Sequence, residues 1–212
     1  MTENLDLKKI EKKTWRSFFE DGIFEIYLGL LHIGVGIAWS FIDVAPFSVF
    51  NLFGIILIVF GFLFFILGKK FITIPRVGKI KFGRKRKVRK MKTVIILSVN
   101  VILLLIIYLF GLLSPPEYLI FPSWFNSLII GFLFTGVPMS IVAYFLDFPR
   151  LYIIAFQWSI TIFLLDMFSL ILSEPFNIII TFAINGSIMV CMGLYFFIKF
   201  LIKYPSPKKE GE

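Results

Sequence analysis

Three ionisable residues lie within long apolar stretches of this chain, where they could exchange a proton or bind a cation. Glu25 and His32 are seven residues apart in the first stretch, and Asp166 is in the fifth. A charged Asp in the middle of a membrane helix costs at least ~2.5–3.5 kcal/mol, so such residues usually face a bundle interior or a water-filled path. Glu25, His32 and Asp166 are therefore the candidate intramembrane polar site.

Other polar residues in the apolar stretches have a simpler interpretation. Asn100, Gln157 and Asn185 lie near the middle of their stretches. Uncharged amide side chains at such depths commonly form hydrogen bonds between helices, worth about 0.6 kcal/mol each. We therefore assign these three residues to helix packing.

The inventory of Cys and His residues excludes several kinds of site. The chain contains one Cys, Cys191, in an apolar stretch where we expect it to be buried, and one His, His32. An intrachain disulfide, a four-Cys zinc site and a double-His motif are therefore excluded. Because no nucleophile–base pair is visible either, we predict no catalytic residue, metal or cofactor, and an enzyme acting on lipids ranks last.

Apolar stretches long enough to cross a membrane carry these residues. Hydrophobic residues make up 58% of the 212, including 28 Phe, and such a composition is typical of a membrane protein. A helix needs about 20 mostly apolar residues to cross the hydrocarbon core. Six stretches qualify and predict an all-α, six-helix bundle, a multi-pass protein of the cell membrane: Gly22–Ile42, Phe47–Gly68, Thr93–Ser114, Trp124–Leu146, Leu151–Leu172 and Phe176–Ile198.

The positive charges predict the orientation of these six spans. Five Lys and Arg residues precede the first span, twelve lie between Lys69 and Lys92, one is Arg150, and four lie from Lys199 onward. With six spans all 22 fall on one side, which the positive-inside rule identifies as the cytoplasm. The chain would then consist of a cytoplasmic tail (1–21), a membrane domain (22–203) with a basic cytoplasmic loop (69–92), and a second cytoplasmic tail (204–212), with both termini inside.

The basic loop allows three interpretations. It could act only as a topology determinant, or it could also attract anionic lipid headgroups, at about 1 kcal/mol per basic residue near the surface. Nucleic-acid binding is disfavoured, because no aromatic platform interleaves the charges. The candidate lipid contacts are Arg76, Lys79, Lys81, Arg84, Lys85, Arg86, Lys87, Arg89 and Lys90.

Two short surface elements are predicted on the same side. The sequences ITI and KIKF flank PRVG, which predicts a hairpin of strand, turn and strand with Pro75 presetting the turn and Gly78 closing it. The first tail places apolar residues such as Trp15 on one arc and basic residues such as Lys12 on the other. This pattern indicates an amphipathic helix on the membrane surface.

Helix breaks are predicted at two prolines. Pro138 should kink the fourth span. Pro149, in the sequence DFPR, disfavours helix at the residue before it, so we expect the fourth and fifth spans to separate there.

Glycines recur at sevenfold spacing in three spans. Sevenfold spacing places residues on one face of a helix, and small residues let helix backbones approach closely in lipid. The first and second spans are joined by a short connection, so we expect them to be antiparallel neighbours with their glycine stripes facing each other and the sixth span as a third partner. The stripes are Gly22, Gly29 and Gly36; Gly54, Gly61 and Gly68; and Gly186 and Gly193.

Three motifs resemble a group of prokaryotic multi-span membrane proteins that have no assigned activity. They are DGIFEIYLGLLHIGVG in the first span, IPRVGKIKF after the second, and FPRLYIIAF at the start of the fifth. That group similarly shows an Asp-Gly-apolar-aromatic-acid start and a Pro-Arg-x-Gly loop. The resemblance implies a multi-span topology and implies no function.

Two functions follow as hypotheses. The first is a structural or regulatory membrane component that acts through helix packing and a basic cytoplasmic surface. Its partners would be the lipid bilayer, anionic headgroups at the cytoplasmic face, and a second copy of the chain or another membrane protein. The alternative is a small transporter or an ion or proton pathway that uses Glu25, His32 and Asp166.

Overall fold

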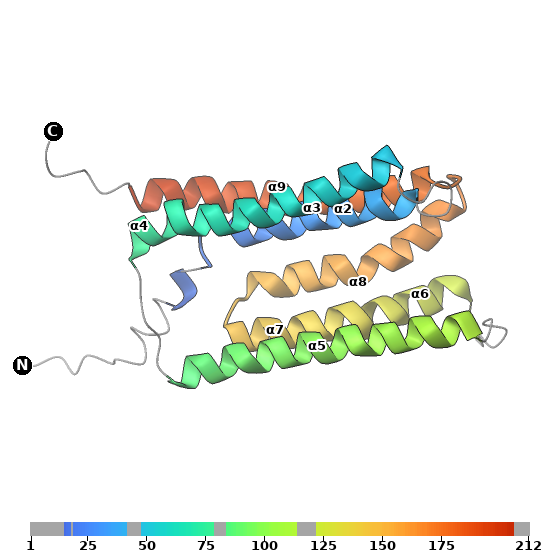
Figure 1. Cartoon of the computed structure of the whole chain (residues 1–212), viewed down its shortest axis with the longest axis horizontal. Coiled ribbons are helices and arrows are strands. Elements are labelled where there is room, and N and C mark those ends of the chain that lie inside the picture. Colours follow the sequence, from blue (N-terminus) through green and yellow to red (C-terminus); the bar gives the residue numbers. More distant parts are fainter. Residues whose placement is uncertain (1–14, 18, 42–47, 79–83, 114–121, 206–212) are drawn as a thin grey trace, which may run out of the picture. The chain divides into compact units, whose positions relative to one another are not determined.

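The computed structural model describes residues 15–17, 19–41, 48–78, 84–113 and 122–205, apart from the side chains of residues 84, 85, 104 and 107–113. All elements within these residues are helices, which confirms the all-α prediction (Figure 1). They are α2 (Ile23–Ser40), α3 (Val49–Gly68), η1 (Lys69–Thr73), α4 (Ile74–Val77), α5 (Arg84–Leu113), α6 (Ser123–Gly131), η2 (Phe132–Gly136), α7 (Val137–Leu146), α8 (Arg150–Ser169) and α9 (Phe176–Lys203), where η1 and η2 are π-helical turns.

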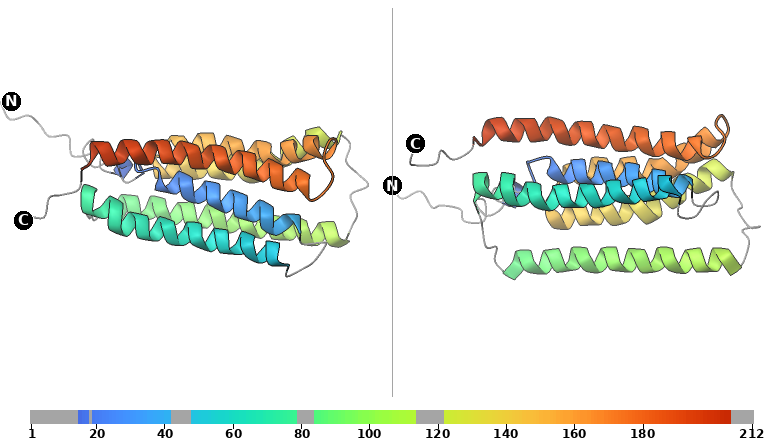
Figure 2. Two further views of the ribbon diagram at one scale, coloured as in Figure 1. Left: turned by 90° about the horizontal axis from the view of Figure 1, so that it is seen from above. Right: turned by 45° about the horizontal axis from the view of Figure 1, so that its top comes forward.

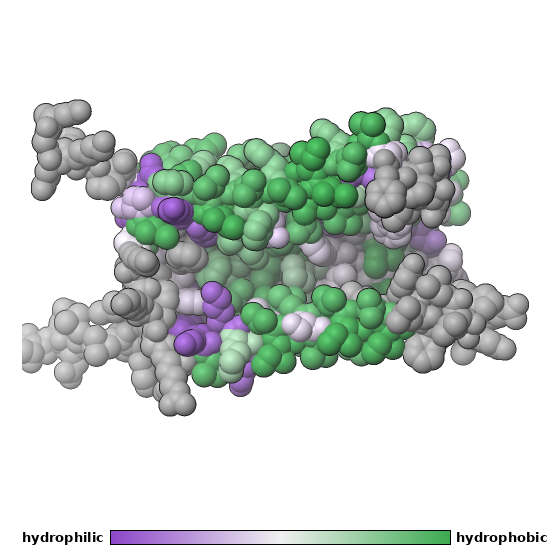
Figure 3. Space-filling model, in the orientation of Figure 1, coloured by the Kyte–Doolittle hydropathy of each residue, from purple (hydrophilic) through white to green (hydrophobic). Residues whose placement is uncertain are grey.

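Five helical segments are long and apolar enough to cross a membrane. They match the predicted first, second, fourth, fifth and sixth spans, and the predicted third span lies in α5. Large apolar side chains on these helices are exposed: in α3, Val49 is 79% and Phe60 57% exposed, whereas Gly54 and Gly61 are buried. Large side chains outside and small ones inside are what a lipid environment favours, and hydrophobic side chains cover the helices in Figure 3. The segments are Ile23–Ser40, Val49–Val77, Ser123–Leu146, Arg150–Ser169 and Phe176–Lys203.

The chain forms two compact units. One comprises residues 1–82 and 186–212 and contains α2, α3, η1, α4 and most of α9. The other comprises residues 83–185 and contains α5 to α8 and the beginning of α9. Within the first unit α2 and α3 pack against each other as antiparallel neighbours, as predicted (Figure 2).

Residue chemistry sets where helices α2 and α3 begin. Gly22 precedes α2 with a φ of 70°, in the left-handed region that favours glycine. Ser48 precedes α3, and its side chain accepts a hydrogen bond from the N–H of Asn51 at 3.3 Å, a typical N-cap. The side chain of Asn51 donates to the carbonyl of Ala38 at 2.7 Å, so the start of α3 is bonded to the end of α2.

Both π-helical turns lie directly before a proline. Pro75 follows η1 and Pro138 follows η2, each two residues after the turn ends. Proline has no N–H, and its ring clashes with the carbonyl four residues earlier in a regular helix. A widened π turn removes this clash without ending the helix. The discontinuity predicted at Pro138 is therefore a π turn.

The predicted hairpin is wrong over the residues that the structure describes. The helix of α3 continues through η1 and α4 as far as Val77, and it ends at Gly78, whose φ is 90°. The helix continues because the π turn η1 accommodates Pro75, and Lys69 and Thr73 within that turn have a buried polar partner, described below. The KIKF segment and most of the predicted amphipathic tail lie outside the described residues; Trp15 is buried.

The predicted break between the fourth and fifth spans is confirmed. Asp147 ends α7 with a left-handed φ of 53°, and its N–H bonds back to the last turn of that helix. The next helix, α8, begins at Arg150.

Candidate functional site at the basic ends of the helices

Asp21 connects the start of α2 to the end of α3. Its side chain is fully buried, and one oxygen, Oδ1, accepts the N–H of Ile23 at 3.2 Å. The other oxygen, Oδ2, accepts hydrogen bonds from Lys69 Nζ, at 2.7 Å, and from Thr73 Oγ1. The Asp-Gly pair at the start of α2 therefore supplies both a carboxylate for the neighbouring helix and a glycine for the left-handed turn.

Lys69 brings its positive charge into the protein. It is only 7% exposed, and its ammonium lies 5.6 Å from the ring centre of Phe19 and 5.9 Å from that of Phe65. Ring faces attract cations, and this attraction adds to the ion pair with Asp21. A buried charge is tolerated because it is paired, so Lys69 depends on Asp21 for its position.

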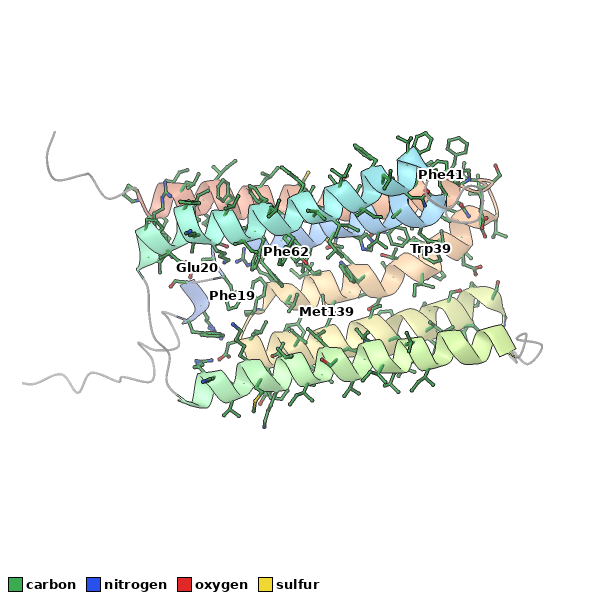
Figure 4. All side chains as sticks on the ribbon, in the orientation of Figure 1. Phe19, Glu20, Trp39, Phe41, Phe62 and Met139 are labelled. Atoms are coloured by element: carbon green, nitrogen blue, oxygen red, sulfur yellow. The ribbon has the colours of Figure 1, made fainter. Side chains whose placement is uncertain are left out.

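A second ion pair joins α9 to the same place. Lys203 Nζ lies 2.8 Å from Glu20 Oε2, and the two side chains are 55% and 41% exposed. Glu20 and Phe19 precede α2 (Figure 4). The start of α2 and the ends of α3 and α9 therefore meet at one end of the first unit.

An ion-pair cluster closes one end of the second unit. Asp147 Oδ2 accepts hydrogen bonds from Arg86 at 2.7 Å and from Arg89 at 3.1 Å. These contacts join the start of α5 to the turn between α7 and α8. In the same region Lys92 Nζ lies 5.7 Å from the ring centre of Phe145. The arrangement gathers the basic residues of the second unit at one end.

The predicted lipid-contact residues differ in exposure. Lys87, Arg89 and Lys90 are exposed, whereas Arg86 is only 8% exposed and its guanidinium binds Asp147. Arg76 is half-buried and donates to the carbonyl of Ile72 at 3.1 Å. The remaining predicted contacts, which are Lys79, Lys81 and the side chains of Arg84 and Lys85, lie outside the part of the chain that the structure describes.

Sequence reasoning missed the acids that organise these ends. Asp21 and Asp147 both occur in motifs noted in the sequence, DGIFE and DFPR, but neither was predicted to bind a cation. Each acid lies at a helix terminus close to a span boundary, on the side that carries the basic residues. An acid in that position is a usable signal for an ion pair with a basic helix end.

The predicted intramembrane polar site is divided between the two units. Glu25 and His32 lie on α2 in the first unit and are 0% and 4% exposed. Asp166 lies on α8 in the second unit; it is half-buried, and its Oδ2 has no hydrogen-bond partner among the described residues. The burial of Glu25 and His32 and the partial burial of Asp166 fit either packing or ion handling.

The amides assigned to packing are not all interhelical. Asn100 on α5 donates to the carbonyl of Phe134 in η2 at 3.1 Å, as predicted. Asn185 instead donates to the carbonyl of Thr181, one turn earlier in the same helix. Within the described residues, Gln157 Oε1 is buried and has no hydrogen-bond partner.

The glycine stripe of α2 faces α9. A Cβ atom added to Gly29 would lie 2.7 Å from the carbonyl oxygen of Gly186, and one added to Gly193 would lie 2.9 Å from that of Gly22. At these four positions the two backbones are in direct contact. Gly36, at the end of the stripe, is buried.

The glycine stripe of α3 packs against another face of α2. A Cβ added to Gly54 would lie 2.6 Å from the carbonyl oxygen of Gly34, and one added to Gly61 would lie 3.1 Å from Cβ of Leu30. Gly68 likewise faces the side chain of Ile23. The prediction that the two stripes face each other is therefore wrong, because α2 uses different faces for its two neighbours.

The predicted burial of Cys191 is also wrong, because this residue is exposed. The buried face of this part of α9 carries Gly186, Met189 and Gly193, at a spacing of three and four residues. Cys191 lies between the last two and points to the opposite side, because each residue turns the helix by about 100°.

Comparisons of this chain with protein-family models, with characterised proteins and with solved structures found no match. Among the described residues, no three His, Cys, Asp or Glu side chains gather in a way that could hold a metal ion.

Proposed function

We propose that this chain is a multi-pass protein of the cell membrane with six spans, in which α5 provides the third span in addition to the five long apolar helical segments, and both termini are cytoplasmic. In this proposal it acts as a structural or regulatory component, and its basic cytoplasmic face binds anionic lipid headgroups. One observation supports this proposal above the others. In each unit the basic residues of the described chain lie at the helix ends that the ion pairs join, and apolar surface covers the helices beyond them.

The ion pairs give this face a defined geometry. Asp21 and Asp147 hold the ends of neighbouring helices together, and the exposed cations Lys87 and Lys90 follow the anchored Arg86 along α5. Each basic residue near an anionic membrane surface contributes about 1 kcal/mol, and salt screens this attraction. Fixed helix ends keep the cations at headgroup height.

The orientation is tested by labelling intact cells with a membrane-impermeant thiol reagent. Single cysteines replace Lys85 and Glu117 in a Cys191→Ser background. We expect labelling at Glu117→Cys in intact cells, and labelling at Lys85→Cys only after permeabilisation. Labelling at Lys85→Cys and not at Glu117→Cys in intact cells would refute the proposed orientation.

Headgroup binding is tested by thermal unfolding of the purified protein with added phosphatidylglycerol or phosphatidylcholine. We expect phosphatidylglycerol to raise the Tm more, and the difference to shrink at high salt. A Lys87→Gln/Lys90→Gln variant should show a smaller difference in Tm between the two lipids. A control variant of two exposed uncharged residues outside the basic helix ends, Ser173→Ala/Ser187→Ala, should match the wild type. Equal Tm values in the two lipids would refute headgroup binding.

The burial of Glu25 and His32 on α2 favours a second candidate function, a proton or cation pathway. Under this candidate, His32→Ala and Asp166→Asn each abolish pH-driven or ion-driven uptake into proteoliposomes while the protein remains folded. Uptake no greater than that of empty liposomes, across a panel of ions, would refute the proton or cation pathway.

A further inference from the structure

A groove of about 510 Å³ opens in the second unit between η2–α7 and α8. One wall carries two rows of residues at helical spacing of four: Phe132, Gly136, Ser140 and Tyr144, and Val137, Ile141 and Phe145. The other wall carries Tyr152, Phe156 and Ser159 of α8. The groove therefore follows the length of α7 along its contact with α8.

Small residues at the floor create this groove. A Cβ atom at Gly136 would collide with the hydroxyl of Ser159, so the two helices touch there. Ser159 is fully buried, and its hydroxyl donates to the carbonyl of Ala155 at 2.6 Å. The hydrogen-bond donor of this hydroxyl is therefore satisfied within α8. The π turn η2 ends at Gly136, the glycine that makes this contact. Close contact at the floor and large residues on both rims produce the hollow.

The dimensions and lining fit one acyl chain. The wall from Phe132 to Phe145 extends about 20 Å at helical rise, compared with about 15 Å of hydrocarbon in one leaflet. The volume of the groove and its mainly aromatic and aliphatic lining are typical of sites for small apolar ligands. The groove opens outward, since Tyr144 is 70% and Phe156 54% exposed.

The charge at one end of the groove indicates the headgroup. Phe145, which lines the groove, has the ammonium of Lys92 5.7 Å from its ring centre. Arg89, 48% exposed, binds Asp147 just beyond the end of α7. Tyr144 and Tyr152 lie at this same end, and Tyr is common where membrane helices meet the headgroup layer. Among the described residues, the cations at this end outnumber the carboxylates, of which Asp147 is one, so an anionic headgroup is complementary to this end.

We propose that the groove binds one anionic phospholipid, with an acyl chain between η2–α7 and α8 and the phosphate beside Lys92 and Arg89. This lipid site rests on the proposed function. It replaces a general attraction to the headgroup layer with binding at one defined place. Tyr144 and Tyr152 supply hydroxyl groups that can donate hydrogen bonds to the phosphate or ester oxygens.

The test counts lipids retained by the purified full-length protein in native mass spectrometry after titration with phosphatidylglycerol or phosphatidylcholine. The wild type should retain one phosphatidylglycerol in preference to phosphatidylcholine. Lys92→Gln should reduce that preference about fivefold. A basic residue near anionic lipid contributes about 1 kcal/mol of binding free energy, and 1.4 kcal/mol corresponds to a tenfold change in affinity. The control for Lys92→Gln is Lys199→Gln, because Lys199 is exposed on α9 and lies over a ring, 6.0 Å from the centre of Tyr195, but is not among the residues that line this groove.

A second pair of variants tests the groove itself. Ser140→Trp places an indole ring within the groove, where it should obstruct the acyl chain and abolish retention of the lipid, whereas Ser187→Trp, on an exposed face of α9, should not. If Ser140→Trp does not elute as a single species, Val137→Trp at the half-exposed rim replaces it.

Two results would overturn the proposal directly: equal retention of the two lipids, or retention of phosphatidylglycerol by the Ser140→Trp variant. A wild-type dimer that Ser140→Trp dissociates would also overturn it, because the groove would then bind a second copy of the chain. If phosphatidylglycerol raises the Tm of the Ser140→Trp variant as much as that of the wild type, the groove is not the lipid site, whereas general headgroup binding is still supported.

Discussion

Replacing Lys69 by Met tests whether the buried ion pair holds the basic end of the first unit together. Lys69 and Asp21 are 7% and 0% exposed, and the ammonium lies 2.7 Å from the carboxylate. Met has a similar length and no charge, so the substitution leaves Asp21 buried with its bonds to Ile23 and Thr73 but without its cation. Removing one partner of a buried pair typically destabilises a protein by about 3–5 kcal/mol.

The expected effect is large enough to measure by thermal unfolding in detergent. In a protein of this length, 1 kcal/mol corresponds to a Tm shift of roughly 2–4 °C, so Lys69→Met should lower the Tm by about 6–20 °C. The matched control is Lys203→Met, which breaks the more exposed pair with Glu20, at 55% and 41% exposure. Exposed pairs contribute about 0–1 kcal/mol, so the control should shift the Tm by less than about 4 °C.

A double variant separates loss of the pair from loss of the Lys side chain. Asp21→Asn/Lys69→Met removes both charges, so it should be less destabilised than the sum of the two single variants. If Lys69→Met lowers the Tm no more than Lys203→Met, or if the two single effects simply add, the ion pair is not what secures this end.

Three further outcomes are expected from the same unfolding measurement. Gly29→Ala should destabilise by about 1–3 kcal/mol and by more than Gly61→Ala, because the new Cβ meets the backbone of Gly186 at 2.7 Å in the first case and a side-chain atom of Leu30 at 3.1 Å in the second; equal shifts would contradict this. Arg86→Gln should lower the free energy of unfolding by about 1.5–3 kcal/mol, since it removes a hydrogen bond to a charged group at a nearly buried position. Arg89→Gln, at 48% exposure, should lower it by about 1 kcal/mol or less. The reverse order would show that Asp147 depends on Arg89. Asn51→Ala should cost about 1 kcal/mol through loss of its bond to the carbonyl of Ala38, and an unchanged Tm would contradict this.

The two acid-centred ion pairs explain how a basic protein of long apolar helices can hold cations at its helix ends without repelling those ends apart. Asp21 and Asp147 each neutralise a buried or nearly buried cation, namely Lys69 and Arg86. Cations farther along the same helix ends remain exposed. A division between anchored and exposed cations therefore arises from two carboxylates.

The sequence by itself determined the helical class and the positions of the long apolar helices. Hydropathy and length are local properties of a segment, and a run of about 20 apolar residues has few alternatives to a helix in lipid, where every backbone group needs an internal partner. The break at DFPR was equally local, because Pro149 restricts the residue before it. The distribution of Lys and Arg predicted an orientation for the same reason, since counting charges per connection needs no knowledge of contacts.

Only the tertiary structure decided which faces of these helices meet. Asp21 and Lys69 are 48 residues apart, and Arg86 and Asp147 are 61 apart, so neither pair is visible as a local pattern. The stripes in α2 and α3 were recognised from sequence, but their partners were not, and the groove beside α7 depends on a contact between Gly136 and Ser159 on different helices. The physical reason is that the lipid-facing and interior sides of a membrane helix are both apolar. Hydropathy therefore does not fix the rotation of a helix about its axis, and that rotation is set by close packing and by buried polar pairs between helices.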